Sequence, residues 1–156
     1  MISLARIDER LIHGQVAYSW TMAYKSDAVM VIDNDVAKDK FQVDLLTMAC
    51  PTGLKCFVVD EEKSIELLKK YENRKFFVVT KHPNVLLHLV KNGIKLESVN
   101  VGGLYFKEGR KQYSKTVYLD TEMEDIFKEL SSAGVILETR TAPTDELIDL
   151  MGLLKG

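Results

Sequence analysis

The chain has 156 residues, of which 46% are hydrophobic and 28% charged, and its formal net charge is −2 at pH 7. These values are ordinary for a globular protein with a sizeable core, so we expect residues 1–156 to form a single domain. Charges of both signs are spread along the chain without a basic block, which argues against nucleic-acid binding. Two cysteines, a charged amino-terminal segment and no apolar run of ~20 residues predict a cytoplasmic protein without a membrane span.

Short apolar runs alternate with amphipathic stretches along the chain. A strand over Met1–Ile7 and a helix over Gln15–Tyr24 come first. Six further strands are expected at residues 28–32, 54–59, 76–80, 98–101, 117–119 and 135–139. Five further helices are expected at 36–49, 61–71, 83–91, 121–133 and 145–154. The alternation predicts an α/β fold, with a mostly parallel, doubly wound sheet of about seven strands flanked by about six helices.

Residues 102–114 interrupt this alternation. They contain Gly102, Gly103 and Gly109 together with several cations. We expect Gly102-Gly103 to form a tight turn, and the segment to lead through a turn or hairpin to an antiparallel edge strand.

Polar side chains follow three of the predicted strands. His13 comes after the first strand, and the ends of the second and fourth strands supply Asn34, Asp35, Thr80, Lys81 and His82. Ligands of such sheets bind beyond the carboxyl ends of the strands, so these loops are expected to line one crevice if the first strand is central. Asp35 also precedes a predicted helix, and capping that helix is an equally good interpretation of it.

Residues 6–16, RIDERLIHGQV, place His13 and Gly14 at the junction between the first strand and the first helix. A histidine there has a ring nitrogen to offer as a nucleophile, and the amides of a helix start can hold an anion. Arginine is well suited to phosphate oxygens, and Arg6 and Arg10 flank the junction. The segment therefore predicts a histidine that carries a phosphoryl group, whereas the simpler alternative makes His13 a turn residue and the arginines surface cations.

Asp8 lies between the two arginines. We interpret it as an orienting carboxylate, which accepts a hydrogen bond from an arginine or from the His13 ring and so selects the ring tautomer. Other phosphate and metal chemistry has no motif here, because the chain lacks G-x-x-x-x-G-K-[ST], G-x-G-x-x-G and any cysteine and histidine set with zinc spacing. The R-H-G motif of histidine acid phosphatases is also missing, since Ile12 precedes His13.

The whole string RIDERLIHGQV resembles the active-site segment of the IIB components of the mannose/fructose/sorbose family of the bacterial sugar phosphotransferase system. Three other segments are similar to the same family, namely Val31–Asp39, Asn100–Leu104 and Arg140–Pro143. The resemblance covers essentially the whole chain. His82 departs from it, because the family usually has a small polar residue at that position.

The resemblance implies that His13 accepts a phosphoryl group from a phosphohistidine of a IIA subunit and passes it to a sugar at the membrane subunits IIC and IID. In the family the accepting nitrogen is Nδ1. The surrounding phosphate-binding residues would be Arg6, Asp8, Arg10, Gly14 and Gln15. No cofactor or metal is implied, and the protein would be cytoplasmic and peripherally associated with the transporter. The alternatives are a regulatory phosphoreceiver or binding module and a stand-alone histidine phosphatase; the sugar and a homodimeric state stay open.

Overall fold

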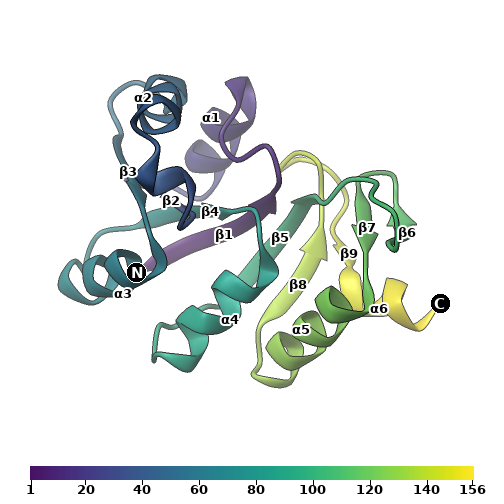
Figure 1. Cartoon of the computed structure of the whole chain (residues 1–156). Helices are drawn as coiled ribbons and strands as arrows, with labels where there is room; N and C mark the ends of the chain where they lie inside the picture. The colour runs from purple at the N-terminus through teal and green to yellow at the C-terminus, as the bar shows by residue number, and fades with distance from the viewer.

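A seven-stranded sheet forms the centre of the computed structural model, which describes all 156 residues (Figure 1). Its strand order is β3-β2-β4-β1-β5-β8-β9. The strands are β1 (Ile2–Asp8), β2 (Ala28–Ile32), β3 (Lys55–Val59), β4 (Phe76–Thr80), β5 (Ser98–Gly103), β8 (Ile136–Thr139) and β9 (Ile148–Asp149). All neighbouring strands are parallel except β9, which runs antiparallel to β8 at the edge. The predicted α/β class is confirmed, and β1 is the central strand.

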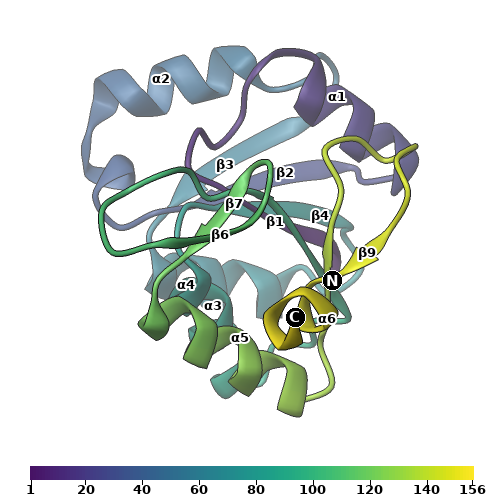
Figure 2. The ribbon, with the colours of Figure 1, turned by 90° about the vertical axis from the view of Figure 1, so that its right-hand side faces the viewer.

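Helices cover both faces of this sheet (Figures 1 and 2). Helices α1 (Gly14–Ala23) and α2 (Lys40–Ala49) lie on one face, above a core cluster of 10 buried residues that includes Trp20. On the other face, α3 (Glu61–Lys70), α4 (Pro83–Lys91), α5 (Thr121–Ser132) and α6 (Leu150–Lys155) enclose a cluster of 25 buried residues. Burial on both faces explains why β2 and β4 are continuously apolar rather than alternating. None of these helices has the length and apolarity to cross a bilayer.

The helix predicted over residues 36–49 is broken into two pieces. A short 3₁₀ turn, η1 (Val36–Lys38), precedes α2, and Asp39 between them has an extended backbone. The Asp39 carboxylate accepts hydrogen bonds from two amides in the first turn of α2 and so caps that helix. The expectation that Asp35 caps a helix is wrong, because its side chain makes no capping bond. Asp33 does this instead, accepting bonds from the amides of Asp35 and Val36.

The carboxyl-terminal region also differs from the prediction of a helix over residues 145–154. Residues Ile148–Asp149 pair with β8 as the edge strand β9, and α6 begins only at Leu150. The carboxylate of Asp149 accepts a hydrogen bond from the Met151 amide and caps this short helix. The antiparallel edge strand therefore comes from the end of the chain.

The strand predicted at residues 117–119 forms but lies outside the main sheet. It is β7 (Val117–Leu119), which pairs antiparallel with β6 (Lys111–Ser114) in a separate two-stranded sheet. The chain at Leu104 is linked to this hairpin by backbone hydrogen bonds to Thr116 and Tyr118. The hairpin is thereby fixed next to the carboxyl end of β5, rather than at the edge of the sheet.

Candidate active site

The loop between β1 and α1 holds His13 at the carboxyl end of the central strand (Figure 1). Two apolar side chains, Leu11 and Ile12, are each 5% exposed and anchor the loop in the core. Leu11 takes a left-handed backbone conformation with φ of 61°, which is strained for a leucine and is held by this burial. His13 itself is extended at the start of α1, and its side chain is 30% exposed. The loop thus presents the imidazole at the surface from a rigid base.

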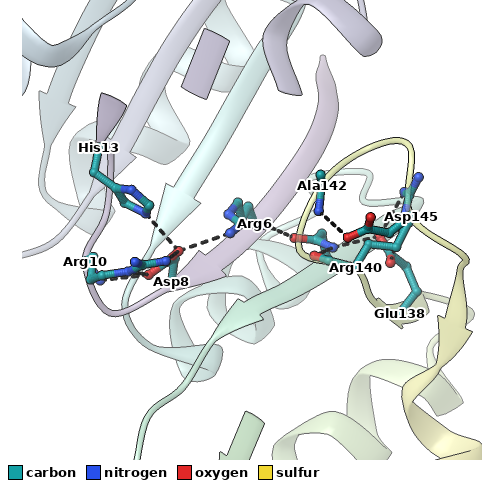
Figure 3. A network of polar contacts seen from close by, with 9 residues as sticks. Arg6, Asp8, Arg10, His13, Glu138, Arg140, Ala142 and Asp145 are labelled. Atoms are coloured by element: carbon teal, nitrogen blue, oxygen red, sulfur yellow. Dashed lines mark hydrogen bonds and ion pairs between the residues drawn. The ribbon is translucent and has the colours of Figure 1, made fainter. Parts of the chain in front are cut away.

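Asp8 is the fully buried centre of the site (Figure 3). Its Oδ2 accepts a hydrogen bond from Arg6 Nη2 at 3.1 Å and lies 3.3 Å from His13 Nε2. Its Oδ1 accepts hydrogen bonds from the Arg10 amide at 2.9 Å and from Arg10 Nε at 3.3 Å. Burial raises the pKa of Asp8, but the hydrogen bonds from Arg10 and the charge of Arg6 outweigh it, so the pKa is lowered overall. Asp8 is therefore a carboxylate at neutral pH.

The contact with Asp8 assigns different roles to the two ring nitrogens of His13. A carboxylate can only accept a hydrogen bond, so the proton of the neutral ring belongs on Nε2. The lone pair is then on Nδ1, which has no hydrogen-bonding partner in the protein. The predicted contact between Asp8 and the imidazole is therefore present, and a neutral ring held in this way presents the lone pair of Nδ1 on the side away from Asp8.

The two predicted phosphate-binding arginines lie in different environments. Arg6 is 2% exposed, its guanidinium donates to both Asp8 and Asn100, and its Cζ lies 5.3 Å from the centre of the Trp20 ring. Burial lowers the pKa of Arg6 and the charge of Asp8 opposes this effect. Arg10 has a side chain that is 53% exposed, and its guanidinium lies 5.1 Å from the centre of the Tyr105 ring. Of the two guanidinium groups, that of Arg10 is open to solvent and that of Arg6 is not.

A chain of polar contacts continues from Arg6 to the loop after β8 (Figure 3). Asn100 Nδ2 donates to Glu138 Oε1 at 3.0 Å and to the Arg140 carbonyl oxygen at 3.1 Å. Glu138 binds Arg140 through two hydrogen bonds of 3.0 Å, and these contacts raise the pKa of Arg140. Arg140 also donates to the hydroxyl of Tyr24 at 2.5 Å. A continuous chain of hydrogen bonds therefore links Asp8 to Tyr24, directly after α1, and to the loop that begins at Arg140.

Gly102 and Gly103 lie at the extended end of β5, so the predicted tight turn is wrong. A Cβ on Gly102 would overlap the guanidinium of Arg6. A Cβ on Gly103 would stand 2.5 Å from the Tyr105 hydroxyl oxygen and 2.8 Å from Asp8 Oδ1. The two glycines are needed because side chains of the site pack directly against their backbone.

The start of α1 adjoins His13 and contains two further predicted site residues. Gly14 and Gln15 are both exposed, and Gly14 has a left-handed backbone with φ of 50°. No side chain caps this helix, so its first amides are free next to the imidazole. An anion at the start of α1 would therefore be bound by backbone amides rather than by side chains.

The other two predicted loops follow β4, which adjoins β1, and β2, which lies one strand further out, and their side chains make different contacts. Asp33 is buried, and its Oδ2 lies 4.0 Å from Nε2 of the exposed His82. Thr80 is buried and its hydroxyl accepts a hydrogen bond from the His82 amide. Asn34, by contrast, is bound to Glu61 of α3 through its side-chain amide and oxygen. Lys81 and Asp35 make no side-chain hydrogen bond, and none of the five residues of these loops is hydrogen-bonded to His13.

Sequence reasoning missed several residues of the polar network, and they left unequal signals. Glu138 is an acid within a run of apolar residues, which indicates a buried carboxylate with a cationic partner. Asn100 stands shortly before the two glycines near the carboxyl end of its strand, which is where a site residue is expected. Tyr105 carried no recognisable signal. The side chains form no group of three or more residues suited to a metal ion.

Comparison with known proteins identifies the family. The sequence family described as "PTS system sorbose subfamily IIB component" matches residues 2–156. The chain belongs to this family. It is 40% identical to the sorbose-specific EIIB component of Lacticaseibacillus casei over 97% of this chain and 93% of that protein. It is 38% identical to the mannose-specific EIIAB component of Escherichia coli K12, covering 99% of this chain but 48% of that longer protein.

The fold of this IIB component agrees with a solved relative. The IIBSor domain of the sorbose permease from Klebsiella pneumoniae superimposes with a TM-score of 0.95 at 32% identity, over 99% of this chain and 96% of that chain. The family resemblance predicted from the sequence is confirmed. The IIB component is thus a phosphotransferase with a phosphoryl-transfer role in a sugar phosphotransferase system.

Proposed function

We propose that His13 is the phosphoryl carrier of this IIB component and that Nδ1 is the atom that accepts the group. The contact between His13 Nε2 and Asp8 Oδ2 is the observation that carries this proposal, because it leaves Nδ1 unprotonated and directed away from the carboxylate. Nδ1 attacks the phosphorus of a phosphohistidine on the IIA subunit, and the bond from that phosphorus to the donor nitrogen breaks. In the second transfer a sugar hydroxyl attacks the same phosphorus, and the bond to Nδ1 breaks.

Arg10 and the free amides of Gly14 and Gln15 are the groups that would stabilise the transferring oxygens. Arg10 is exposed and adjacent to His13, and the α1 amides have no capping side chain. Arg6 has another task in this proposal. Its buried guanidinium donates a hydrogen bond to Asp8, and Asp8 in turn orients the His13 ring. Arg6 is therefore a positioning residue and not a phosphate ligand.

The neighbouring loops would form the rim of the phosphoryl site. His82 and Lys81 lie on the loop after β4, next to β1, and His82 is more than half exposed. Thr80 orients this loop through its hydrogen bond to the His82 amide. Asn34 and Asp35 contribute less, because Asn34 is engaged by Glu61.

The partners we propose are a IIA subunit as donor and the membrane subunits IIC and IID, which hold the sugar that accepts the group. The mannose-specific relative is named EIIAB, so an A unit and a B unit occur in that one chain. A cytoplasmic protein, bound peripherally to its transporter, would meet both partners in turn.

The proposal is tested by relay of labelled phosphate from phosphorylated IIA to the purified protein, followed by addition of membranes with IIC, IID and sugar. The wild-type protein should take up label and form sugar phosphate, and His13→Ala should do neither. His88→Ala is the matched control, because His88 pairs with Glu61 away from His13 and its loss should leave the relay intact. Label on His13→Ala would contradict the proposal. Labelling without sugar phosphate would favour the regulatory alternative, and free phosphate released from small esters would favour a phosphatase.

A further inference from the structure

The hydroxyl group of Tyr105 is buried at the centre of the site and has no hydrogen-bonding partner in the protein. Tyr105 follows the end of β5, and its ring is half-buried beneath the guanidinium of Arg10. A buried hydroxyl without a partner destabilises a folded protein, because it has given up water without replacing it. Such a group is therefore a candidate for a contact that forms in another state of the molecule.

The Tyr105 hydroxyl lies near enough to Asp8 for the carboxylate charge to act on it. The Tyr105 hydroxyl oxygen and Asp8 Oδ1 lie 2.5 Å and 2.8 Å from the position that a Cβ on Gly103 would occupy, so both adjoin the same point of β5. The Tyr105 amide donates to Glu9 Oε1 at 2.7 Å, and Arg110 binds both Glu9 and the Tyr105 carbonyl oxygen. Burial, followed by the charge of Asp8, raises the pKa of the Tyr105 hydroxyl, so the group keeps its proton and can donate it in a hydrogen bond.

Arg10 is the group whose movement would free Asp8 Oδ1 to accept a hydrogen bond from the Tyr105 hydroxyl. Its side chain donates to Asp8 through Nε at 3.3 Å and Nη2 at 3.4 Å, both long bonds, and the side chain is 53% exposed. A phosphoryl group on His13 would attract the guanidinium more strongly than a carboxylate that Arg6 already neutralises. When Arg10 turns to the phosphoryl oxygens, Asp8 Oδ1 loses one of its two donors.

We propose that Tyr105 is a positioning residue that takes over from Arg10 in the phosphorylated protein. Its hydroxyl donates to Asp8 Oδ1 while Arg10 binds the phosphoryl group, so Asp8 keeps its orientation and continues to hold the Nε2 proton of His13. The inference rests on the proposed function, because it needs a phosphoryl group on His13. The hydroxyl of Tyr105 donates to Asp8 only while His13 carries the phosphoryl group.

The substitution Tyr105→Phe separates the two states, with Tyr118→Phe on β7 as the matched control. In the unphosphorylated protein Tyr105→Phe should leave the melting temperature unchanged or raise it, since the hydroxyl has no partner to lose. The equilibrium of phosphoryl exchange with IIA should shift toward phosphorylated IIA by about tenfold, the size expected for one hydrogen bond to a charged group. The ¹⁵N chemical shift of His13 Nε2 should change only in the phosphorylated variant. Tyr118→Phe should match wild type in all three measurements.

Two results would overturn the inference alone. One is a Tyr105→Phe protein whose exchange equilibrium and Nε2 shift equal those of phosphorylated wild type. The other is a lowered melting temperature of the unphosphorylated variant, which would show that the hydroxyl already has a partner at rest. A wild-type protein that takes no phosphoryl group on His13 would overturn the proposed function and this inference together.

Discussion

At the scale of single residues, the site depends on one buried carboxylate surrounded by donors. Arg6, Arg10 and His13 all direct nitrogen atoms at Asp8. Burying such a charge is costly unless it is paired, and removing one partner of a buried pair leaves the other uncompensated. The same group therefore determines both the tautomer of His13 and part of the stability of the fold.

The substitution Asp8→Asn should lower the free energy of unfolding at pH 7 by about 3 kcal/mol, because it leaves the buried Arg6 without its counter-charge. The pKa of Asp8 is lowered in the folded protein: burial raises it, and the hydrogen bonds from Arg10 and the charge of Arg6 more than reverse this. Its stabilisation is thus fully present above the unfolded pKa of about 3.9 and is lost as the pH falls through the folded value.

Urea unfolding of wild type and Asp8→Asn at pH 7 and at pH 3 measures this dependence. The difference between the two proteins should shrink at the lower pH. Asp44→Asn, at an exposed position on α2, is the control and should differ little from wild type at either pH. A difference that is equal at both pH values would show that the Asp8 charge does not act as described.

At the scale of elements, strand β5 is shaped by the side chains that pack on it. The substitution Gly102→Ala would place a Cβ where it overlaps the Arg6 guanidinium, which is buried and held by hydrogen bonds to Asp8 and Asn100. We expect a loss of about 1–3 kcal/mol in the free energy of unfolding, as for other overpacked interiors.

Gly152→Ala is the matched control for that change. Gly152 lies in α6, where the nearest side-chain atom to an added Cβ would be Asp149 Oδ2 at 3.9 Å, and alanine favours a helix over glycine by up to about 1 kcal/mol. Chemical denaturation should find Gly102→Ala less stable than wild type and Gly152→Ala as stable or more so. Equal stability of the two variants would mean that β5 tolerates a side chain at residue 102.

The elements that the sequence predicted well are those with a strong local pattern. Apolar runs such as residues 76–80 form strands because both faces of the sheet are covered, and this is visible from composition alone. The break between η1 and α2 was not visible, because helix-compatible residues continue across it and the outcome depends on where the Asp39 carboxylate points. Likewise Ile148–Asp149 becomes a strand only because β8 offers a free edge.

The candidate site was predictable only where its residues lie close together in the sequence. The motif places His13, Asp8 and Arg10 within six consecutive residues, so their proximity follows from the sequence. The burial of Arg6 does not, because it depends on Asn100 and Gly102, more than ninety residues away. The position of Tyr105 beside Asp8 is set by Glu9 and the distant Arg110, contacts that no local pattern encodes.

At the scale of the whole molecule, the proposed function makes the surface around His13 the docking face for the partners. On α1, Tyr18 and Met22 are exposed and available to a partner, whereas Trp20 is fully buried in the core. The cations of residues 102–114 contribute less positive charge to this surface than their number suggests, because Lys107 and Arg110 both pair with Glu9. Lys81 and Lys111 have no ion-pair partner in the protein, and we propose that they attract an acidic IIA surface.

Electrostatic steering by these cations predicts a salt-dependent encounter. The second-order rate of relay from IIA should fall several-fold between roughly 50 and 500 mM salt, because charges on separate exposed surfaces are screened. The first-order transfer step within the complex should change little. Single-turnover relay at several protein concentrations separates the two rates, and a second-order rate that stays constant with salt would remove the steering role of these cations.

The central claim, that Asp8 leaves Nδ1 of His13 as the accepting atom, is tested most directly by NMR of the phosphorylated protein. The protein is labelled with ¹⁵N in its histidines and phosphorylated through IIA, and phosphorus–nitrogen couplings identify the bonded atom. We predict one phosphorylated ring, that of His13, with phosphorus bonded to Nδ1 and the proton retained on Nε2 toward Asp8. Phosphorus on Nε2 of His13, or on His82 or His88, would contradict the account.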